Sequence, residues 1–104
     1  MGVEIVFLTE NETIKAGEER RTPPLNISMY ELKTVSLIGD YGFEVTIEVS
    51  DDGSNFHTYS SESATANQLY VKSFRDAFMW VRVKVKNGDT ADHTLAYLAV
   101  KGLK

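Results

Sequence analysis

The sequence contains no cysteine, and this absence excludes several classes of protein. Without thiols the chain has no disulfide framework, no cysteine nucleophile and no cysteine-ligated zinc or iron–sulfur site. Its two histidines, His57 and His93, stand in no H-x-H or H-E-x-x-H motif and at no recognised spacing from a carboxylate. A G-x-S-x-G nucleophile motif and a glycine-rich phosphate loop are also missing. We therefore expect a protein that is not an enzyme and has no cofactor.

The chain also lacks a long apolar segment. The run from Val3 to Leu8 is interrupted by Glu4, and it is too short for a signal peptide or a membrane span. The formal net charge of −4 disfavours binding to nucleic acid or to an anionic membrane. The sequence thus predicts synthesis in the cytoplasm without a signal peptide, and neither nucleic acid nor membrane as a partner.

A strand pattern is the clearest feature that the sequence does contain. Every second residue from Phe43 to Val49 is apolar, and polar residues lie between them. A period of two is typical of a strand with one buried and one solvated face. Asp51-Asp52-Gly53 then supplies turn residues, and an aromatic run restarts at Phe56. This segment predicts an antiparallel all-β protein.

Similar short segments recur along the whole chain, separated by turn residues. The expected strands are residues 3–8, 13–16, 34–38, 43–50, 56–59, 68–74, 78–86 and 94–100. Seven or eight such strands predict one antiparallel β-sandwich domain over residues 1–104, of jelly-roll or Greek-key type. The residues expected to face the core are Ile5, Phe7, Leu37, Phe43, Val45, Ile47, Val49, Leu69, Val71, Val81, Val83, Val85, Leu98 and Val100.

The segments between these strands carry the expected breakers. Pro23-Pro24 cannot donate to a central ladder and predicts a loop or a sheet edge. Residues 25–32 are consistent with one helical turn that places Tyr30 and Leu32 beneath the sheets, and the small polar residues 60–67 predict a surface loop.

Charge is distributed unevenly along the sequence. Residues 1–52 hold four Lys or Arg against eleven Asp or Glu, a net charge of −7, whereas residues 53–104 hold seven against four, a net charge of +3. Acidic early strands paired with basic late strands inside one domain would explain this split. Complementarity between subunits of an assembly would explain it too.

The basic strand at residues 80–85 supplies most of the candidate functional residues. If Val81 faces the core, then Trp80, Arg82 and Lys84 share the opposite face. A lone tryptophan there can cover a loop of its own chain, enter a subunit interface or stack on a ligand such as a sugar. Tyr59 and Tyr70 could add aromatic surface, so these five residues are the interface or ligand candidates.

One oxygen-rich cluster is a weak candidate for a calcium site. Asp40, Asp51, Asp52 and Asn55 carry the oxygen ligands that calcium prefers. The cluster lacks the carboxylate spacing and final glutamate of an EF-hand loop. A turn in which aspartate accepts local hydrogen bonds explains the same residues, and we expect no metal there.

Residues 43–86 resemble the galactose-binding-like jelly rolls, including discoidin-type domains. The similarity lies in the turn Ser50–Phe56 and in the later strand Trp80-Val81-Arg82-Val83. Where those families usually have an arginine just before the aromatic residue, this chain has Met79, and it also lacks their end-to-end disulfide. The resemblance implies a jelly-roll fold and, as an alternative function, carbohydrate binding.

The layout of the whole chain is also similar to small β-sandwich proteins of tailed-phage particles. The shared features are the segment Pro23–Glu31, the strand with an SDDG turn and the WVRVKV strand near the C-terminus. This resemblance implies a structural protein of a virion, with a decoration, tail or adaptor role. Its partners would be itself, as a homo-oligomer with a trimer slightly favoured over a dimer, and other particle proteins. The rival interpretations are a glycan-binding module and an enzyme whose site is assembled across subunits.

Overall fold

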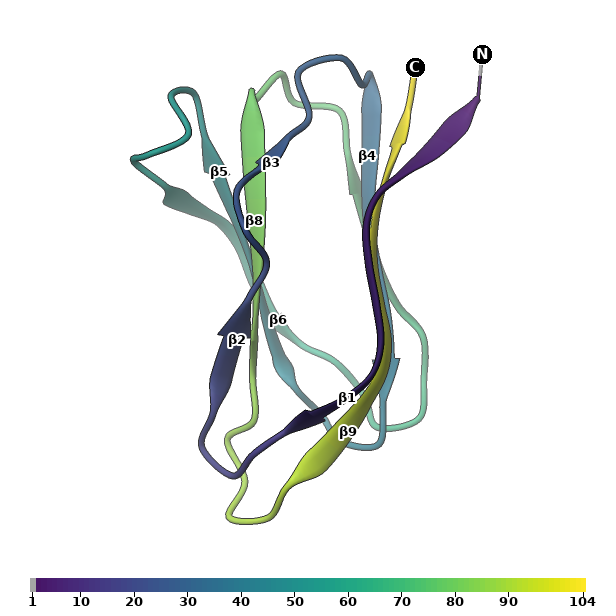
Figure 1. Ribbon diagram of the computed structural model, residues 1–104, viewed down its shortest axis with the longest axis vertical. Helices are drawn as coiled ribbons and strands as arrows, with labels where there is room; N and C mark the ends of the chain where they lie inside the picture. Colours follow the sequence, from purple (N-terminus) through teal and green to yellow (C-terminus); the bar gives the residue numbers. More distant parts are fainter. Residues whose placement is uncertain (1) are drawn as a thin grey trace.

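The structure is a computed structural model that describes residues 2–104. These residues form two antiparallel sheets packed face to face (Figure 1). The strands are β1 (Val3–Ile14), β2 (Glu19–Arg21), β3 (Leu25–Asn26), β4 (Leu32–Gly39), β5 (Glu44–Ser50), β6 (His57–Ser63), β7 (Tyr70–Phe74), β8 (Trp80–Lys86) and β9 (His93–Leu103). The predicted all-β sandwich is confirmed, although with nine strands instead of seven or eight. Over the part of the chain that is described, no helix is long and apolar enough to cross a membrane.

The two sheets have a nested order of strands. Sheet A runs β1-β9-β4-β7, and sheet B runs β2-β8-β5-β6, with β3 also paired to β8. The first strand therefore pairs with the last, β2 and β3 pair with β8, β4 pairs with β7, and β5 pairs with β6. A chain that follows this order is one long antiparallel hairpin rolled round a core, which is a jelly roll.

The core lies between the sheets and is built from alternate residues of the central strands. Val45 and Ile47 of β5 are fully buried, as is Val83 opposite Ile47 on β8. The register predicted from the alternation of residues 43–50 and 81–85 is therefore confirmed. From sheet A the matching residues are Val35, Leu37, Leu98 and Val100, each at most 4% exposed.

Two sequence-based expectations fail in β1. Residues 13–16 do not start a second strand, because β1 continues without a break to Ile14. The pairing of β1 with β9 shifts between Ile5 and Phe7, so these two residues face opposite sides of sheet A. Phe7 packs against the core as expected, but Ile5 is 62% exposed. A simple period of two cannot anticipate this change, because a bulge adds one residue.

The inward face of β7 was also assigned wrongly. Leu69 and Val71 point outward and are exposed, whereas Tyr70 and Phe74 point inward. The larger aromatic rings close the side of the core, and the aliphatic residues between them face solvent.

Proline explains why sheet B gains two short strands. Pro23 and Pro24 have no N–H groups, so they interrupt the edge of the sheet and divide it into β2 and β3. Thr22 bridges the interruption, because its N–H donates to the Val83 carbonyl (2.9 Å) and its hydroxyl accepts from the Val83 N–H (3.0 Å). The expected edge at Pro23-Pro24 is confirmed, and β2 and β3 act as two pieces of one jelly-roll strand.

The expected helical turn in residues 25–32 is absent. Residues 25–26 form β3, and the side chain of Asn26 accepts a hydrogen bond from the Ser28 N–H (3.0 Å), which stabilises a tight turn instead. Tyr30 does pack beneath sheet A, against Gly102, where a Cβ atom would lie 2.2 Å from its ring. Leu32, expected there too, begins β4 and faces outward. Of the predicted surface loop 60–67, residues 60–63 belong to β6.

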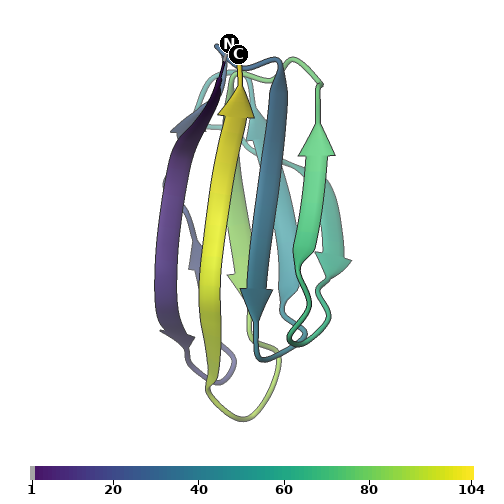
Figure 2. The same ribbon diagram turned by 90° about the vertical axis from the view of Figure 1, so that its right-hand side faces the viewer.

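The two ends of the described chain lie side by side at one end of the sandwich (Figures 1 and 2). The N–H of Lys104 donates to the carbonyl of Gly2 at 3.5 Å, and the Lys104 ammonium pairs with Glu4 at 3.2 Å. These contacts follow from the pairing of the first strand with the last.

Candidate functional site

The outer face of sheet B carries the predicted charge pairs. Arg82 of β8 donates to Glu48 of β5 at 2.9 Å, and Glu44 lies opposite Lys86 in the β5–β8 register. The Lys84 ammonium lies 3.8 Å from Glu19 of β2. The expectation that acidic early strands pair with basic late ones inside one chain is thus confirmed for this sheet. The outer face of sheet B is therefore charged, and its acidic and basic side chains pair with one another across neighbouring strands.

Trp80 and Arg82 are both engaged by the loop between β5 and β6. The Arg82 guanidinium lies over the Phe56 ring, 4.2 Å from its centroid, and its side chain is 23% exposed. The Trp80 ring lies against Gly53, which has a positive φ of 78°. A Cβ atom at position 53 would lie 3.0 Å from the indole, so this glycine permits close contact. Trp80 therefore covers a loop of its own chain, which is one of the three roles considered for it. The residue is half-buried.

Tyr59 and Tyr70 lie away from Trp80, at the side of the core between β6 and β7. The Tyr59 ring packs on Phe74 with centroids 4.9 Å apart, and its hydroxyl donates to Asp76, which raises the Tyr59 pKa. The Tyr70 hydroxyl donates to Glu62 at 2.9 Å. Burial and that hydrogen bond raise the Tyr70 pKa to about 12. The five interface or ligand candidates are thus separated in the structure. Three of them, on β8, belong to the outer face of sheet B, and the two tyrosines lie at the side of the core.

The oxygen-rich residues of the weak metal candidate form a closed turn. The Asp52 carboxylate accepts hydrogen bonds from the backbone N–H groups of Asn55 (2.8 Å) and Ser54 (2.9 Å) and from the Ser50 hydroxyl (2.9 Å). These donors hold the Asp52 pKa well below its usual range. Asp51 is exposed in the same turn. Among residues 2–104 no three His, Cys, Asp or Glu side chains are arranged to hold a metal ion.

Asp40, the remaining member of the weak metal candidate, lies beside His93, a histidine for which the sequence predicted no carboxylate partner. His93 contacts Asp89 through Nε2 (2.7 Å) and Asp40 through Nδ1 (3.3 Å), and it stacks on Tyr41. The hydrogen bond to Asp89, followed by the charge of Asp40, raises the His93 pKa. The spacing of four residues between Asp89 and His93 was the available signal. The group joins the β4–β5 loop to the β8–β9 loop.

A second residue that the sequence analysis missed is the buried Lys33. Its side chain is 1% exposed, and its ammonium donates to the Asp76 carbonyl at 2.7 Å near the face of Phe74. Burial lowers the Lys33 pKa, and the nearby charge of Asp76 opposes that change. Lys33 therefore ties the start of β4 to the β7–β8 loop.

A small cleft opens between β1 and β2 at one side of the sandwich. It has a volume of about 70 Å³, with an apolar floor that includes Phe7, Ile14 and Leu98. Drug-sized ligands occupy clefts of roughly 300–1,000 Å³, so this one admits only a small group. Arg20 stands at its mouth.

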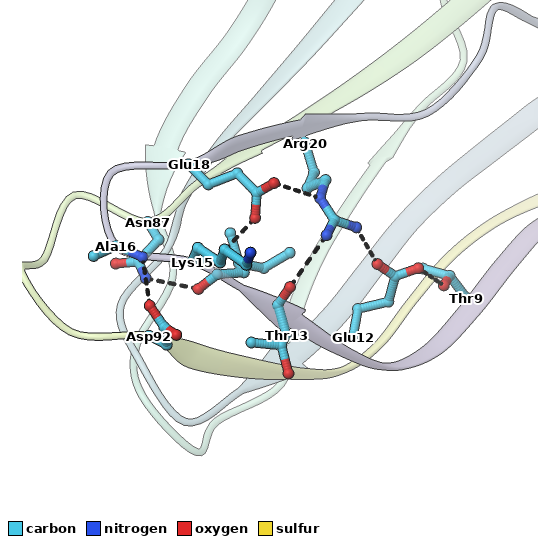
Figure 3. Close-up of polar contacts among 10 residues, drawn as sticks. Thr9, Glu12, Thr13, Lys15, Ala16, Glu18, Arg20, Asn87 and Asp92 are labelled. Carbon is cyan, nitrogen blue, oxygen red and sulfur yellow. Dashed lines mark hydrogen bonds and ion pairs between the residues drawn. The ribbon is translucent and has the colours of Figure 1, made fainter.

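Figure 3 shows that the polar groups around Arg20 already have partners. Arg20 pairs with Glu12 and with Glu18 (3.1 Å), and it also reaches the Thr13 carbonyl (3.3 Å). Glu18 accepts from the Lys15 N–H (2.8 Å), which is the main cause of its lowered pKa. This network holds β1 against β2 and braces the turn between them.

The outer face of sheet A contrasts with that of sheet B because it is largely apolar. Figure 2 views sheet A from this side. Read across β1, β9, β4 and β7, its rows are Val3, Leu103 and Leu32; Ile5, Lys101, Thr34 and Ser73; Leu8, Ala99, Ser36 and Val71; and Glu10, Tyr97 and Ile38. Leu69 adjoins it at the start of β7. Its large apolar residues Val3, Ile5, Leu8, Leu69 and Val71 are 46–66% exposed. We call this surface the sheet A outer face.

The fold and these surfaces define a jelly-roll β-sandwich, and comparisons with known proteins agree. The chain matches no protein-family model, and no curated protein is significantly similar to it. Among solved structures, the exported protein XepA of PBSX, a phage-like element, superposes with a TM-score of 0.74 at 18% identity. That match covers 99% of this chain, which spans 38% of the XepA chain.

Two further structures illustrate how widely the fold is shared. A carbohydrate-binding module (CBM6) of Cellvibrio mixtus lichenase 5A, solved with cellotriose, has a TM-score of 0.56 at 11% identity, covering 97% of this chain and 100% of its own. The protein of Bacillus endospore appendages, which form disulfide-linked pili, has a TM-score of 0.59 at 18% identity, covering 99% and 88%. At these identities the similarity establishes the fold. The structures that share this fold thus include a protein of a phage-like element and a carbohydrate-binding module.

Proposed function

We propose that this protein is a non-enzymatic structural component of a phage or phage-like particle. It acts by associating with copies of itself and with other particle proteins. The observation that carries this proposal is the sheet A outer face, because a large apolar sheet surface is typical of a protein that is covered by a partner. The similarity to XepA over nearly the whole chain supports the setting in a phage-like particle.

The polar side chains of the molecule are consistent with this assignment. Arg20, Arg82 and His93 are engaged by carboxylates of the same chain, and Tyr59 and Tyr70 donate to carboxylates. These groups stabilise the sandwich and its loops. The surface that remains to be explained is therefore the apolar one.

Particle purification tests the proposal directly. Phage-like particles released from the source cells after induction are separated on a density gradient, and peptides of this protein are sought by mass spectrometry. We expect the protein to sediment with the particles at a constant ratio to their major proteins. A protein found only in the unsedimented fraction, while the particles are intact, would contradict the proposal.

Carbohydrate binding is the alternative function, and one observation favours it. Trp80 is only half-buried and shares the polar outer face of β8 with Arg82, and the CBM6 module that shares this fold was solved with cellotriose. Titration with cellotriose and with galactose, followed by Trp80 fluorescence, tests the idea. Saturable quenching in the wild type, together with a loss of sugar binding in Trp80→Phe measured by isothermal titration calorimetry, would support glycan binding. An unchanged signal at millimolar sugar would count against it.

A further inference from the structure

We propose that the sheet A outer face binds a second copy of this chain in a two-fold dimer. The inference deepens the proposed function by naming the surface and its occupant, and it rests on that function only for its biological setting.

The size of the face fits a specific interface. Four strands about 4.8 Å apart and about 3.3 Å per residue in length give β1, β9, β4 and β7 a face of roughly 500 Å². Two such faces in contact would bury roughly 1,000 Å² or more, which is about the lower limit for a specific protein–protein contact. Face-to-face contact of two sheets is also how the interior of this molecule is built.

The charges of the face are placed for two-fold pairing. Within the four described strands the face carries one acidic and one basic residue, Glu10 and Lys101. They lie on opposite sides of the row formed by Leu8, Ala99, Ser36 and Val71, one row above it and one row below it. A two-fold axis along that middle row places Lys101 of one copy over the row that holds Glu10 of the other. The two charges then lie one strand apart, about 4.8 Å in the plane of the sheet, within reach of the lysine side chain, and the contact occurs twice by symmetry.

The middle row itself permits close approach. Ala99 and Ser36 are small, and although they point outward they are only 1% and 6% exposed, because larger neighbours flank them. Leu8 and Val71 stand at the two ends of the row and are exposed. A partner copy on the same axis covers these two aliphatic side chains with its own.

The β1 edge of sheet A is less suited to association than the face of the sheet. β1 is long, but its pairing with β9 shifts at Val6, and Asn11 has a positive φ of 52°. Bulges and charged residues on an edge strand oppose the addition of another strand, and β1 carries Glu4, Glu10 and Glu12. A pair of copies therefore forms through the face, and one self-complementary face closes with two copies. This assignment replaces the slight preference for a trimer that the sequence alone suggested.

Sedimentation equilibrium on matched variants tests the dimer. Val71→Lys and Leu8→Lys each place a charge in the middle row, whereas Thr58→Lys places the same charge on the outer face of sheet B, next to Glu48. All three positions are exposed on edge strands, and far-UV circular dichroism and thermal unfolding verify folding. We expect the wild type and Thr58→Lys to form dimers at about 100 µM, and Val71→Lys and Leu8→Lys to weaken them by at least about tenfold.

Two further measurements remain decisive if a lysine variant fails to fold. Glu10→Lys and Lys101→Glu should each weaken the dimer, and the double variant should restore it. Because the native chain has no cysteine, Val71→Cys offers a single thiol. On the proposed axis a short bismaleimide links Val71→Cys to its own copy, whereas Thr58→Cys dimerises without being cross-linked and runs as a monomer on a denaturing gel.

Several results would overturn the inference. They are a monomer at about 100 µM, a trimer, a dimer that neither Val71→Lys nor Leu8→Lys weakens, or a face occupied only by a different particle protein. Co-sedimentation with particles is measured separately, so a protein that enters particles as a monomer refutes the dimer and leaves the proposed function standing. A protein that dimerises through this face but is absent from the particles refutes the proposed function and leaves the dimer standing.

Discussion

At the scale of single residues, Gly53 is the position where backbone conformation and packing coincide. Its φ is 78°, and a side chain there would meet the Trp80 indole at 3.0 Å. Gly17 has a similar φ of 72° but has open space where its Cβ would be. The two glycines therefore separate the cost of a left-handed backbone from the cost of a steric clash.

We predict that Gly17→Ala lowers the free energy of unfolding by about 1 kcal/mol, because alanine is strained at positive φ. Gly53→Ala should cost more, about 2 kcal/mol or above, because the methyl group also displaces the indole. It should shift the emission of Trp80, the only tryptophan in the chain. Urea unfolding followed by circular dichroism and by fluorescence measures both effects. Equal costs for the two variants would show that the contact between Gly53 and Trp80 contributes nothing.

The burial of a single residue can be predicted from the sequence when the residue fits the alternation of its strand and its polarity agrees with that alternation. The inward residues Val81, Val83 and Val85 obey the period of two, so they were predictable. Lys33 obeys the same period and lies inside, but its charge suggested the opposite. Its burial depends on a nearby carbonyl, that of Tyr30, and on the distant carbonyl of Asp76, which only the folded structure brings to Lys33.

At the scale of secondary structure, the interrupted edge of sheet B depends on the Thr22 hydroxyl. Thr22 is 4% exposed, and it is the acceptor for the N–H of Val83. We predict that Thr22→Val costs about 1–3 kcal/mol, because that N–H would be left buried without a partner. Thr22→Ser keeps the hydroxyl and is the matched control, with a smaller cost from the lost methyl group. Chemical denaturation measures both, and a valine variant as stable as the wild type would contradict the role of the hydroxyl.

The free energy of unfolding should depend on pH through His93, which joins the β4–β5 and β8–β9 loops. Its pKa is raised in the folded state by Asp89 and Asp40, so the folded protein holds the proton more tightly than the unfolded chain. The stability that His93 contributes is therefore complete below its unfolded pKa of about 6.5 and is lost as pH rises through the raised pKa. We predict that the difference in unfolding free energy between the wild type and His93→Gln is larger at about pH 5.5 than at about pH 8.5. A difference that stays constant over this range would exclude the linkage.

The boundaries of the strands were harder to predict from the sequence than the existence of the strands. Alternation located β5 and β8 well, because both are central strands of sheet B with one continuous register. β1 was divided in two because its residues 9–12 are all polar and show no alternation, and β2 and β3 are too short to show any period. Edge strands with bulges follow tertiary pairing more than local sequence.

At the scale of the whole molecule, the nested pairing of strands constrains how the chain folds. β1 cannot pair with β9, nor β2 with β8, until residues far apart in the sequence meet. Closing such long loops costs entropy before contacts compensate, so proteins dominated by distant pairings fold slowly. We predict refolding in milliseconds to seconds, and stopped-flow fluorescence of Trp80 measures it. A relaxation in microseconds would contradict this expectation.

The two outer faces illustrate what the sequence could and could not indicate about function. The charge split between the halves of the chain correctly suggested the pairing of Glu48 with Arg82. Attention to aromatic residues pointed to Trp80, Tyr59 and Tyr70, each of which has packing or hydrogen-bond partners in its own chain. The sheet A outer face was not anticipated, because Ile5, Leu69 and Val71 were expected in the core. An exposed aliphatic residue has the same sequence signature as a buried one.

The contact between Gly2 and Lys104 has a consequence for how this sandwich can be handled by evolution or by design. Since the two ends meet at one pole, a short linker can close the chain into a ring, and the ring can be cut at an exposed turn such as Gly88. For the same reason the sandwich can be spliced into a loop of an unrelated host protein, entering and leaving through one narrow gap. Neither rearrangement requires a linker to cross the sheet A outer face.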